Sequence, residues 1–232
     1  MATSVSLSRV RAAFTMPELL IVIAIIALLV SLLVPVLADV RKSAMGVECL
    51  SHLRNIGQAV TMYCSDHHGE FPLSSHTAGS LVDSAAWLNS LEKYGVTDQD
   101  RFCPLDLNAD QKLTSYATNE HFEPLAAGID YNPFTGQPIP GGRTIVYDNS
   151  SMIPRPYATI YAYEPDSPGT VDHLSTHEFA TSDDVADAIA VRRHLDAANY
   201  LFVDGHVRSW LWSDFSARFS PQTSPFDPRT AH

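Results

Sequence analysis

The sequence predicts an α+β fold in which one long N-terminal helix is followed by a domain of short strands. Two observations predict it. An uncharged apolar block near the N-terminus runs on into an amphipathic helical pattern, and a later region rich in Pro, Gly, Asn and Asp contains short apolar stretches. A chain of 232 residues has room for a long helix and one modest domain, whereas two full-size domains would be crowded.

The first element is an apolar segment long enough to span a membrane. Residues 19–38 carry no charged side chain. At a rise of about 1.5 Å per residue they would form a helix about 30 Å long, which matches the thickness of a hydrocarbon core. We therefore predict that residues 14–38 form the transmembrane half of the helix. Basic residues lie on both sides of it, so positive charge alone does not orient it.

The second half of the helix, residues 39–66, is predicted to be amphipathic. Apolar residues recur there at spacings of three or four, which is typical of a helix that buries a narrow stripe. These apolar positions are Val40, Ala44, Val47, Leu50, Leu53, Ile56, Val60 and Tyr63. Pro35 removes one backbone hydrogen bond from the first half, so we expect a kink there.

Residues 67–219 are predicted to form a separate domain with short strands, because short apolar stretches there are bounded by turn residues. The predicted strands are residues 144–147, 157–163 and 200–203. Asp204 and Gly205 form a hairpin-turn pattern, so residues 206–210 should return as the next strand.

Two further segments complete the prediction. Residues 85–94 have large apolar side chains on neighbouring helical turns and predict a short helix. Residues 220–232 are polar and contain three prolines, so we expect a flexible tail.

The composition argues against nucleic-acid binding and against catalysis. After Ala38 the chain has 13 basic and 25 acidic side chains, a net charge of −12, and lacks a basic stripe for phosphate backbones. It contains no G-x-S-x-G, H-E-x-x-H or phosphate-binding glycine pattern. Nothing in the sequence around Cys103 supplies a base that would activate it. We therefore expect no nucleic-acid partner, no enzymatic activity and no catalytic residues.

The start of the apolar segment carries a processing motif. The stretch AFTMPELL, residues 13–20, resembles the cleavage site of type IV prepilins and type II secretion pseudopilins. In that family a short basic leader is cut before a hydrophobic residue, and a Glu follows four residues later. The resemblance implies a leader over residues 1–13, cleavage between Ala13 and Phe14, and N-methylation of Phe14. Ala13 stands where the family most often has Gly.

Glu18 is the predicted assembly residue. A carboxylate near the centre of a membrane span costs about 2.5–3.5 kcal/mol, so a carboxylate at the edge of a span is expected to have a compensating partner. In a filament, Glu18 of one subunit can neutralise the α-amine of Phe14 in its neighbour while the apolar helices pack together. The alternative is that Glu18 only lies among the lipid headgroups.

Later motifs resemble those of the large pilin-like family that is abundant in planctomycete-type bacteria. They are CLSHLRNIGQA at 49–59, FCPLD at 102–106, SYATN at 115–119, and the C-terminal signature at 194–207, named for a His, nine residues and Asp-Gly. Their order implies a pilin-like fold, with a membrane-embedded long helix packed on a small antiparallel β-sheet. Residues 67–219 would then be the exported domain.

The same resemblance implies a structural function. The chain would be a subunit of a type IV pilus-like or type II secretion pseudopilus filament, with no required cofactor. Its partners would be copies of itself, other pilins or pseudopilins, the prepilin peptidase and the assembly platform. It would cross the inner membrane once, with its C-terminal domain exported to the periplasm or into the filament.

The C-terminal signature has two interpretations. In the structural one, Asp204 and Gly205 form a turn and His194 bonds nearby backbone carbonyls. In the other, His194, Asp204 and His206 converge on zinc or another first-row divalent ion. Because major pseudopilins bind calcium through loop oxygens, a calcium site that includes Asp204 or the acidic pair at 183–184 is a further version.

The three cysteines do not form a disulfide scaffold or metal-type pairs, but an exported domain could oxidise two of them. We expect a disulfide between Cys103 and either Cys49 or Cys64, with Cys49 and Cys103 as the preferred pair. Buried free thiols are the other outcome.

Two other functions stay open. The chain could be a membrane-anchored exported module that binds a ligand or metal and does not polymerise. Alternatively, Val-Leu-Ala at residues 36–38 fits the cleavage rule of a conventional signal peptide, which would release a soluble secreted enzyme that begins at Asp39.

Overall fold

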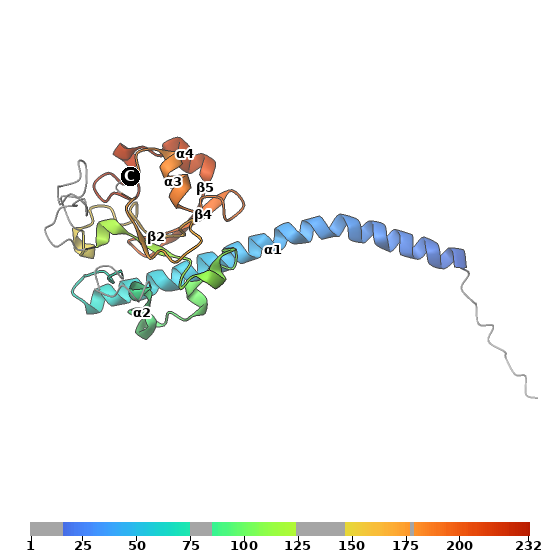
Figure 1. Cartoon of the computed structure of the whole chain (residues 1–232), viewed down its shortest axis with the longest axis horizontal. Coiled ribbons are helices and arrows are strands. Elements are labelled where there is room, and N and C mark those ends of the chain that lie inside the picture. The colour runs from blue at the N-terminus through green and yellow to red at the C-terminus, as the bar shows by residue number, and fades with distance from the viewer. Residues whose placement is uncertain (1–15, 75–84, 124–146, 177–178) are drawn as a thin grey trace, which may run out of the picture. The chain divides into compact units, whose positions relative to one another are not determined.

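The computed structural model describes residues 16–74, 85–123, 147–176 and 179–232 (Figure 1). The chain divides into two compact units, Met1–Arg41 and Lys42–His232. The predicted α+β class, with a long N-terminal helix and a small sheet, is confirmed.

The described part of the first unit is helical. Helix α1 (Met16–Asp66) begins here and ends in the second unit. Its large apolar side chains from Leu19 to Leu37 are between 45% and 65% exposed. Pro35 lies inside α1 and does not end it, while the expected kink stays a prediction. In length and composition this segment fits a single membrane span.

In the second unit, α1 buries one stripe from Cys49 onward. Of the predicted apolar positions, Leu53, Ile56 and Val60 are buried, whereas Val47 is 67% exposed. The other buried residues of α1 are Gly57, Ala59 and Cys64. The predicted stripe is therefore confirmed only where the domain covers the helix.

Among the described residues, three short helices follow α1. They are α2 (Ala86–Asn89), α3 (Ser182–Ala188) and α4 (Trp212–Arg218). Short 3-10 turns lie at Glu92–Tyr94, Gln99–Arg101, Ala109–Gln111, Glu120–Phe122, Ser150–Met152 and Pro221–Thr223. The helix predicted at residues 85–94 therefore becomes α2 and the first of these turns. Gly95, at φ 98°, ends that turn in a left-handed conformation.

In the described part of the second unit the sheet has five strands, in the order β3-β1-β2-β4-β5. They are β1 (Ala117–Asn119), β2 (Ile160–Tyr163), β3 (His173–Leu174), β4 (Ala197–Phe202) and β5 (Val207–Leu211). Neighbouring strands are antiparallel except β1 and β3, which are parallel. The expected antiparallel sheet is thus wrong in this respect and the sheet is mixed. The chain reverses after β2 and places β3 on the far side of β1, where it runs in the same direction as β1.

Two apolar clusters cover the two faces of the sheet. Tyr161 and Leu201 belong to the cluster that contains the buried stripe of α1. Tyr163 and Tyr200 belong to the other cluster, which contains residues of α3 and α4. Figure 1 shows the part of α1 that belongs to the second unit on one side of β2 and β4, with α3 and α4 on the other side. Because both faces are covered, β4 is buried along its whole length, and all of its residues except Asn199 are apolar or aromatic.

The strand predictions have different outcomes. Those at residues 157–163 and 200–203 overlap β2 and β4, and the return strand at 206–210 overlaps β5. The strand predicted at 144–147 lies outside the described residues except for Tyr147, which is buried.

Residues 220–232 do not form the expected loosely ordered tail. Phe226 is completely buried and packs edge-on against Tyr163, with the ring centroids 5.6 Å apart. Its carbonyl accepts a hydrogen bond of 2.6 Å from Asn119 Nδ2. The prediction of a flexible tail is wrong because one buried aromatic side chain anchors a segment whose composition is otherwise mostly polar.

Candidate functional site

The N-terminal processing residues are placed only in part. Ala13 and Phe14 lie outside the described residues, so cleavage and methylation there stay predictions. Glu18 lies in the first turn of α1, directly before the uncharged apolar segment. Partial positive charge at a helix N-terminus favours a carboxylate at this position.

The Asp-Gly of the C-terminal signature forms the turn between β4 and β5. Asp204 Oδ1 accepts a hydrogen bond of 3.1 Å from the backbone N–H of His206. Gly205 has a φ of 85°, a conformation that L side chains rarely adopt. The His206 ring stacks on Phe202 with the centroids 4.2 Å apart. These contacts match the structural interpretation of the turn.

The same turn packs closely on α1. An ideal Cβ added to Gly57 would lie 2.6 Å from Leu201 Cδ1 and 3.0 Å from the carbonyl oxygen of Gly205. One helical turn further along α1, the hydroxyl of Thr61 donates a hydrogen bond of 2.9 Å to the backbone carbonyl of Gly57. Glycines on both sides therefore allow the helix and the hairpin to approach this closely.

His194 lies at the other end of β4. Leu195 and Asp196 both have positive φ, 53° and 66°, and form a tight turn between His194 and Ala197. The backbone N–H of His194 donates to the carbonyl of Ala197 at 2.9 Å. This turn directs the His194 side chain into the domain, where it is 5% exposed.

The predicted metal set of His194, Asp204 and His206 is therefore not assembled. The six residues of β4 separate His194 from the turn at Asp204 and span about 20 Å of strand. In the acidic pair at 183–184, Asp184 has a role within a helix rather than in the predicted calcium site. Asp184 accepts hydrogen bonds from the backbone N–H of Thr181 at 2.7 Å and from its hydroxyl at 2.9 Å, which caps α3.

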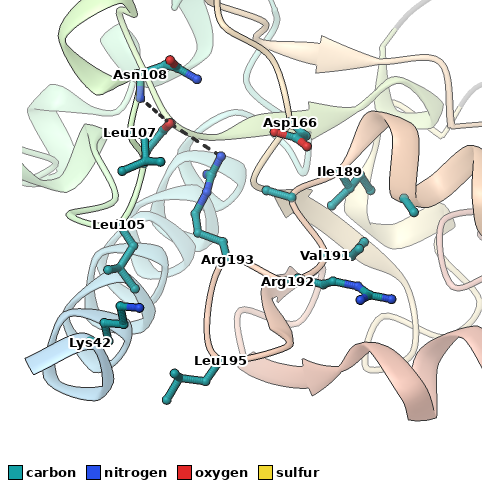
Figure 2. A pocket seen from close by; sticks show the side chains of 13 residues that line it. Lys42, Leu105, Leu107, Asn108, Asp166, Ile189, Val191, Arg192, Arg193 and Leu195 are labelled. Carbon is teal, nitrogen blue, oxygen red and sulfur yellow. Dashed lines mark hydrogen bonds and ion pairs between the residues drawn. The ribbon is translucent and has the colours of Figure 1, made fainter. Parts of the chain in front are cut away.

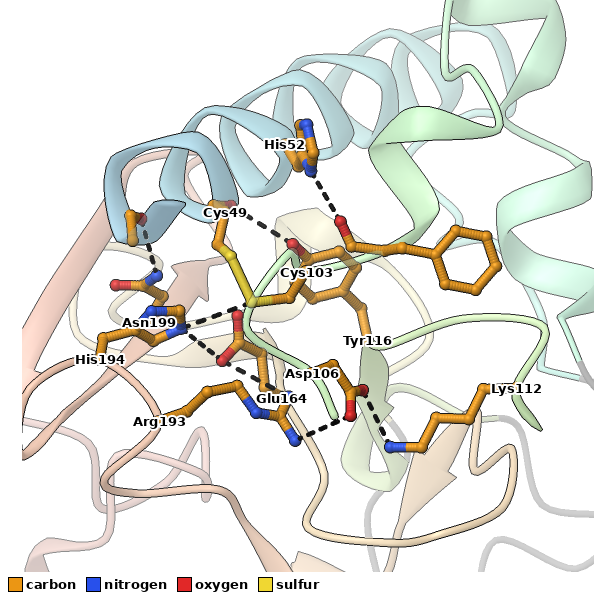
Figure 3. The surroundings of a disulfide bond; sticks show 12 residues. Cys49, His52, Cys103, Asp106, Lys112, Tyr116, Glu164, Arg193, His194 and Asn199 are labelled. Carbon is orange, nitrogen blue, oxygen red and sulfur yellow. Dashed lines mark hydrogen bonds and ion pairs between the residues drawn. A yellow bond between two sulfur atoms is a disulfide. The ribbon is translucent and has the colours of Figure 1, made fainter. Parts of the chain in front are cut away.

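Instead, His194 contacts a buried group that includes the disulfide (Figure 3). Its Nε2 lies 2.7 Å from Glu164 Oε2 and 3.8 Å from the sulfur of Cys103. The structure joins Cys103 to Cys49 with a Cα–Cα distance of 4.9 Å, and leaves Cys64 as a buried free thiol. This pairing is the preferred one of the two that the sequence left open.

A network of buried ion pairs continues from this group. Arg193 lies 3.7 Å from Glu164 Oε2 through Nη1 and 3.6 Å from Asp106 Oδ1 through Nη2. Lys112 Nζ donates to Asp106 Oδ2 at 2.9 Å, and both side chains are almost fully buried. Burial alone would raise the pKa of the Asp106 carboxyl, but the hydrogen bond from Lys112 and the charge of Arg193 hold this pKa below its usual value.

The network borders a cavity of about 630 Å³ (Figure 2). The Arg193 side chain extends across its wall toward the loop that carries Asn108, whose backbone N–H donates to Asp106 at 3.1 Å. Leu107 and Leu195 also line it and are 94% and 54% exposed. The lining has both charged and apolar side chains, and among the described residues that form it none is a Ser, Cys or His.

Sequence reasoning missed Glu164, Arg193 and Lys112. Each is a charged residue in a region of mixed composition, and long-range contacts rather than local spacing bring them together. One signal was present, because Glu164 directly follows a predicted strand with apolar residues on both faces. An acid that continues such a strand is expected to be buried and to need a partner.

Comparison with known proteins found no matching family model, no matching curated protein and no matching solved structure.

Proposed function

We propose that this chain is a structural subunit of a type IV pilus-like or type II secretion pseudopilus filament. Prepilin peptidase cuts it between Ala13 and Phe14, and Phe14 is then N-methylated. Residues 14–38 hold the subunit in the inner membrane before assembly and pack against sister helices in the filament. The second unit is exported and covers the filament surface.

The observation that carries the proposal is the exposed apolar surface of α1. Every described residue from position 16 to position 44 is exposed, and residues 19–38 are uncharged. Such a surface requires either lipid or other apolar helices around it. A subunit that leaves the membrane to enter a filament meets these two environments in turn.

Glu18 supports assembly rather than anchoring alone. An anchor needs only apolar residues, and a carboxylate at the entrance of the span weakens insertion. In a filament the Glu18 carboxylate pairs with the charged amine of Phe14 from the neighbouring subunit. That pairing explains why an acid lies in the first turn of α1.

Membrane fractionation combined with intact-mass measurement tests the proposal. We expect the chain in the membrane fraction, with a mature mass that begins at N-methylated Phe14. An uncut chain in the membrane would instead support an anchored module that does not polymerise. A soluble product that begins at Asp39 would contradict both functions and support secretion.

A second candidate function is the anchored module itself, with a metal ion as its ligand. One observation favours it. Ligand atoms of Cys49, Cys103, Glu164 and His194 all lie within 4.8 Å of one another in the interior of the second unit. Metal binding by itself does not exclude filament assembly, because this group is buried in the second unit and the proposed assembly surface belongs to the first.

A further inference from the structure

We propose that, while Cys49 and Cys103 are reduced, the second unit binds one zinc ion through Cys49, Cys103, His194 and Glu164. Formation of the disulfide then expels the ion. The site lies outside the segment proposed for assembly, so the inference does not depend on filament formation.

The distances suit a small tetrahedral ion. The four ligand atoms lie within 4.8 Å of one another. Tetrahedral zinc, with bonds of about 2.0–2.3 Å, places its ligand atoms roughly 3.3–3.8 Å apart. Once the sulfur–sulfur bond is broken, small side-chain rotations of the two cysteines are enough to reach these separations.

The chemistry of the ligands selects zinc over calcium. Two thiolates, one imidazole and one carboxylate are a zinc donor set, whereas calcium takes oxygen ligands. Glu164 also has an oxygen that is available to bind a metal ion, because within the described part of the chain its Oε1 is buried and accepts no hydrogen bond. A buried carboxylate oxygen without a partner is unusual and suits a ligand that binds in another state.

The buried charges are also balanced. Asp106 and Glu164 carry two negative charges, and Lys112 and Arg193 carry two positive charges. Two thiolates and one zinc ion add no net charge to this group. The zinc form therefore does not leave an uncompensated charge in the interior.

Both steps balance. Zinc binding to the newly made chain releases two protons, one from each thiol, and needs no reductant. In the second step an oxidised dithiol, a disulfide-exchange partner, accepts two electrons from the two thiolates. It takes up two protons and becomes a dithiol, the Cys49–Cys103 bond forms, and the zinc ion is released.

The test uses the full chain in detergent, reduced with a phosphine that is then removed under argon. Circular dichroism first checks that the reduced chain is folded. Zinc is then titrated against a chromophoric chelator, and Co²⁺ is used as a spectroscopic probe. We expect one ion per reduced chain, thiolate-to-cobalt charge-transfer absorption, and no binding by the oxidised chain.

Matched variants separate this site from adventitious thiol binding. Cys49→Ser and His194→Gln should each weaken zinc binding about 100-fold or more, whereas Cys64→Ser should bind as the unmodified chain does. The proposal is overturned if the folded, reduced chain binds no zinc. It is equally overturned if Cys49→Ser retains binding, or if a reduced chain that has unfolded does not refold when zinc is added.

Discussion

At the scale of single residues, two glycines of α1 differ in what surrounds them. Gly57 faces the hairpin so closely that an added Cβ would lie 3.0 Å from the backbone oxygen of Gly205. The nearest atom to an added Cβ at Gly46 is His194 Nδ1, at the ordinary contact distance of 3.4 Å. Both glycines weaken the helix by a similar amount, so their substitutions isolate the effect of packing.

We expect Gly57→Ala to lower the free energy of unfolding by about 1–2 kcal/mol. Overpacking of about 1–3 kcal/mol outweighs a gain of up to about 1 kcal/mol in helix propensity. Gly46→Ala should leave stability unchanged or raise it by up to about 1 kcal/mol. Urea unfolding of the full chain in detergent measures both. Equal stability of the two variants would show that the hairpin does not pack on Gly57.

The buried pair of Asp106 and Lys112 gives the domain a stability that depends on pH. The pKa of Asp106 is lower in the folded chain than its usual value. The carboxylate therefore stabilises the fold above about pH 4, and this contribution is lost as the pH falls through the folded pKa.

A double variant, Asp106→Asn with Lys112→Met, tests this dependence without leaving either charge buried alone. We expect the loss of stability between about pH 5 and pH 3 to be smaller in this variant than in the unmodified chain. Urea unfolding at a series of pH values measures it. Curves that remain parallel down to about pH 3 would mean that Asp106 does not contribute.

At the scale of elements, the sequence correctly predicted the features that depend on neighbouring residues, which are the buried stripe of α1 and the hairpin of β4 and β5. The amphipathic spacing places Leu53, Ile56 and Val60 correctly in the buried stripe of α1. The Asp204-Gly205 pair correctly predicts the hairpin, because turn geometry requires these residue types. The parallel pairing of β1 with β3 could not be predicted, since it depends on how a long connection folds back.

The C-terminal segment is the clearest element-scale error. A polar composition with three prolines is typical of a flexible tail, but composition does not reveal the pocket that receives Phe226. Asn119 binds the carbonyl of Phe226, and its Oδ1 accepts a hydrogen bond of 2.6 Å from Thr176. These contacts join residues far apart in sequence, so local pattern contains no information about them.

Replacing Phe226 tests whether this segment is part of the fold. Phe226→Ala removes a fully buried aromatic side chain, and we expect it to lower the free energy of unfolding by about 3–5 kcal/mol. Gln222→Ala, in an exposed position of the same segment, should change it by less than about 0.5 kcal/mol. Limited proteolysis should likewise remove the segment in the first variant only. Similar stability of the two variants would contradict this and support the original prediction that residues 220–232 form a flexible tail.

At the scale of the whole molecule, the chain combines a unit that suits an apolar environment with a unit that has its own core. The sequence predicted the long apolar helix of the first unit, because residues 19–38 are uncharged and long enough to span a membrane. It predicted the buried charge network poorly, because Glu164 and His194 are 30 positions apart in the sequence. Their partnership depends on the folded sheet.

The central claim is that α1 serves first as an anchor and then as the surface on which subunits stack. Glu18→Ala should leave membrane insertion intact or slightly improved, because it removes a charge from the edge of the span. Its effect should appear only when subunits assemble. Glu48→Ala changes an exposed acid of the same helix outside the apolar segment, and serves as the control.

The most direct measurement is the fraction of each variant recovered in sheared filaments, relative to its amount in the membrane. The proposed pairing with Phe14 predicts a strong reduction for Glu18→Ala and no change for Glu48→Ala. Equal recovery of Glu18→Ala and the unmodified chain would contradict the claim that this carboxylate joins neighbouring subunits.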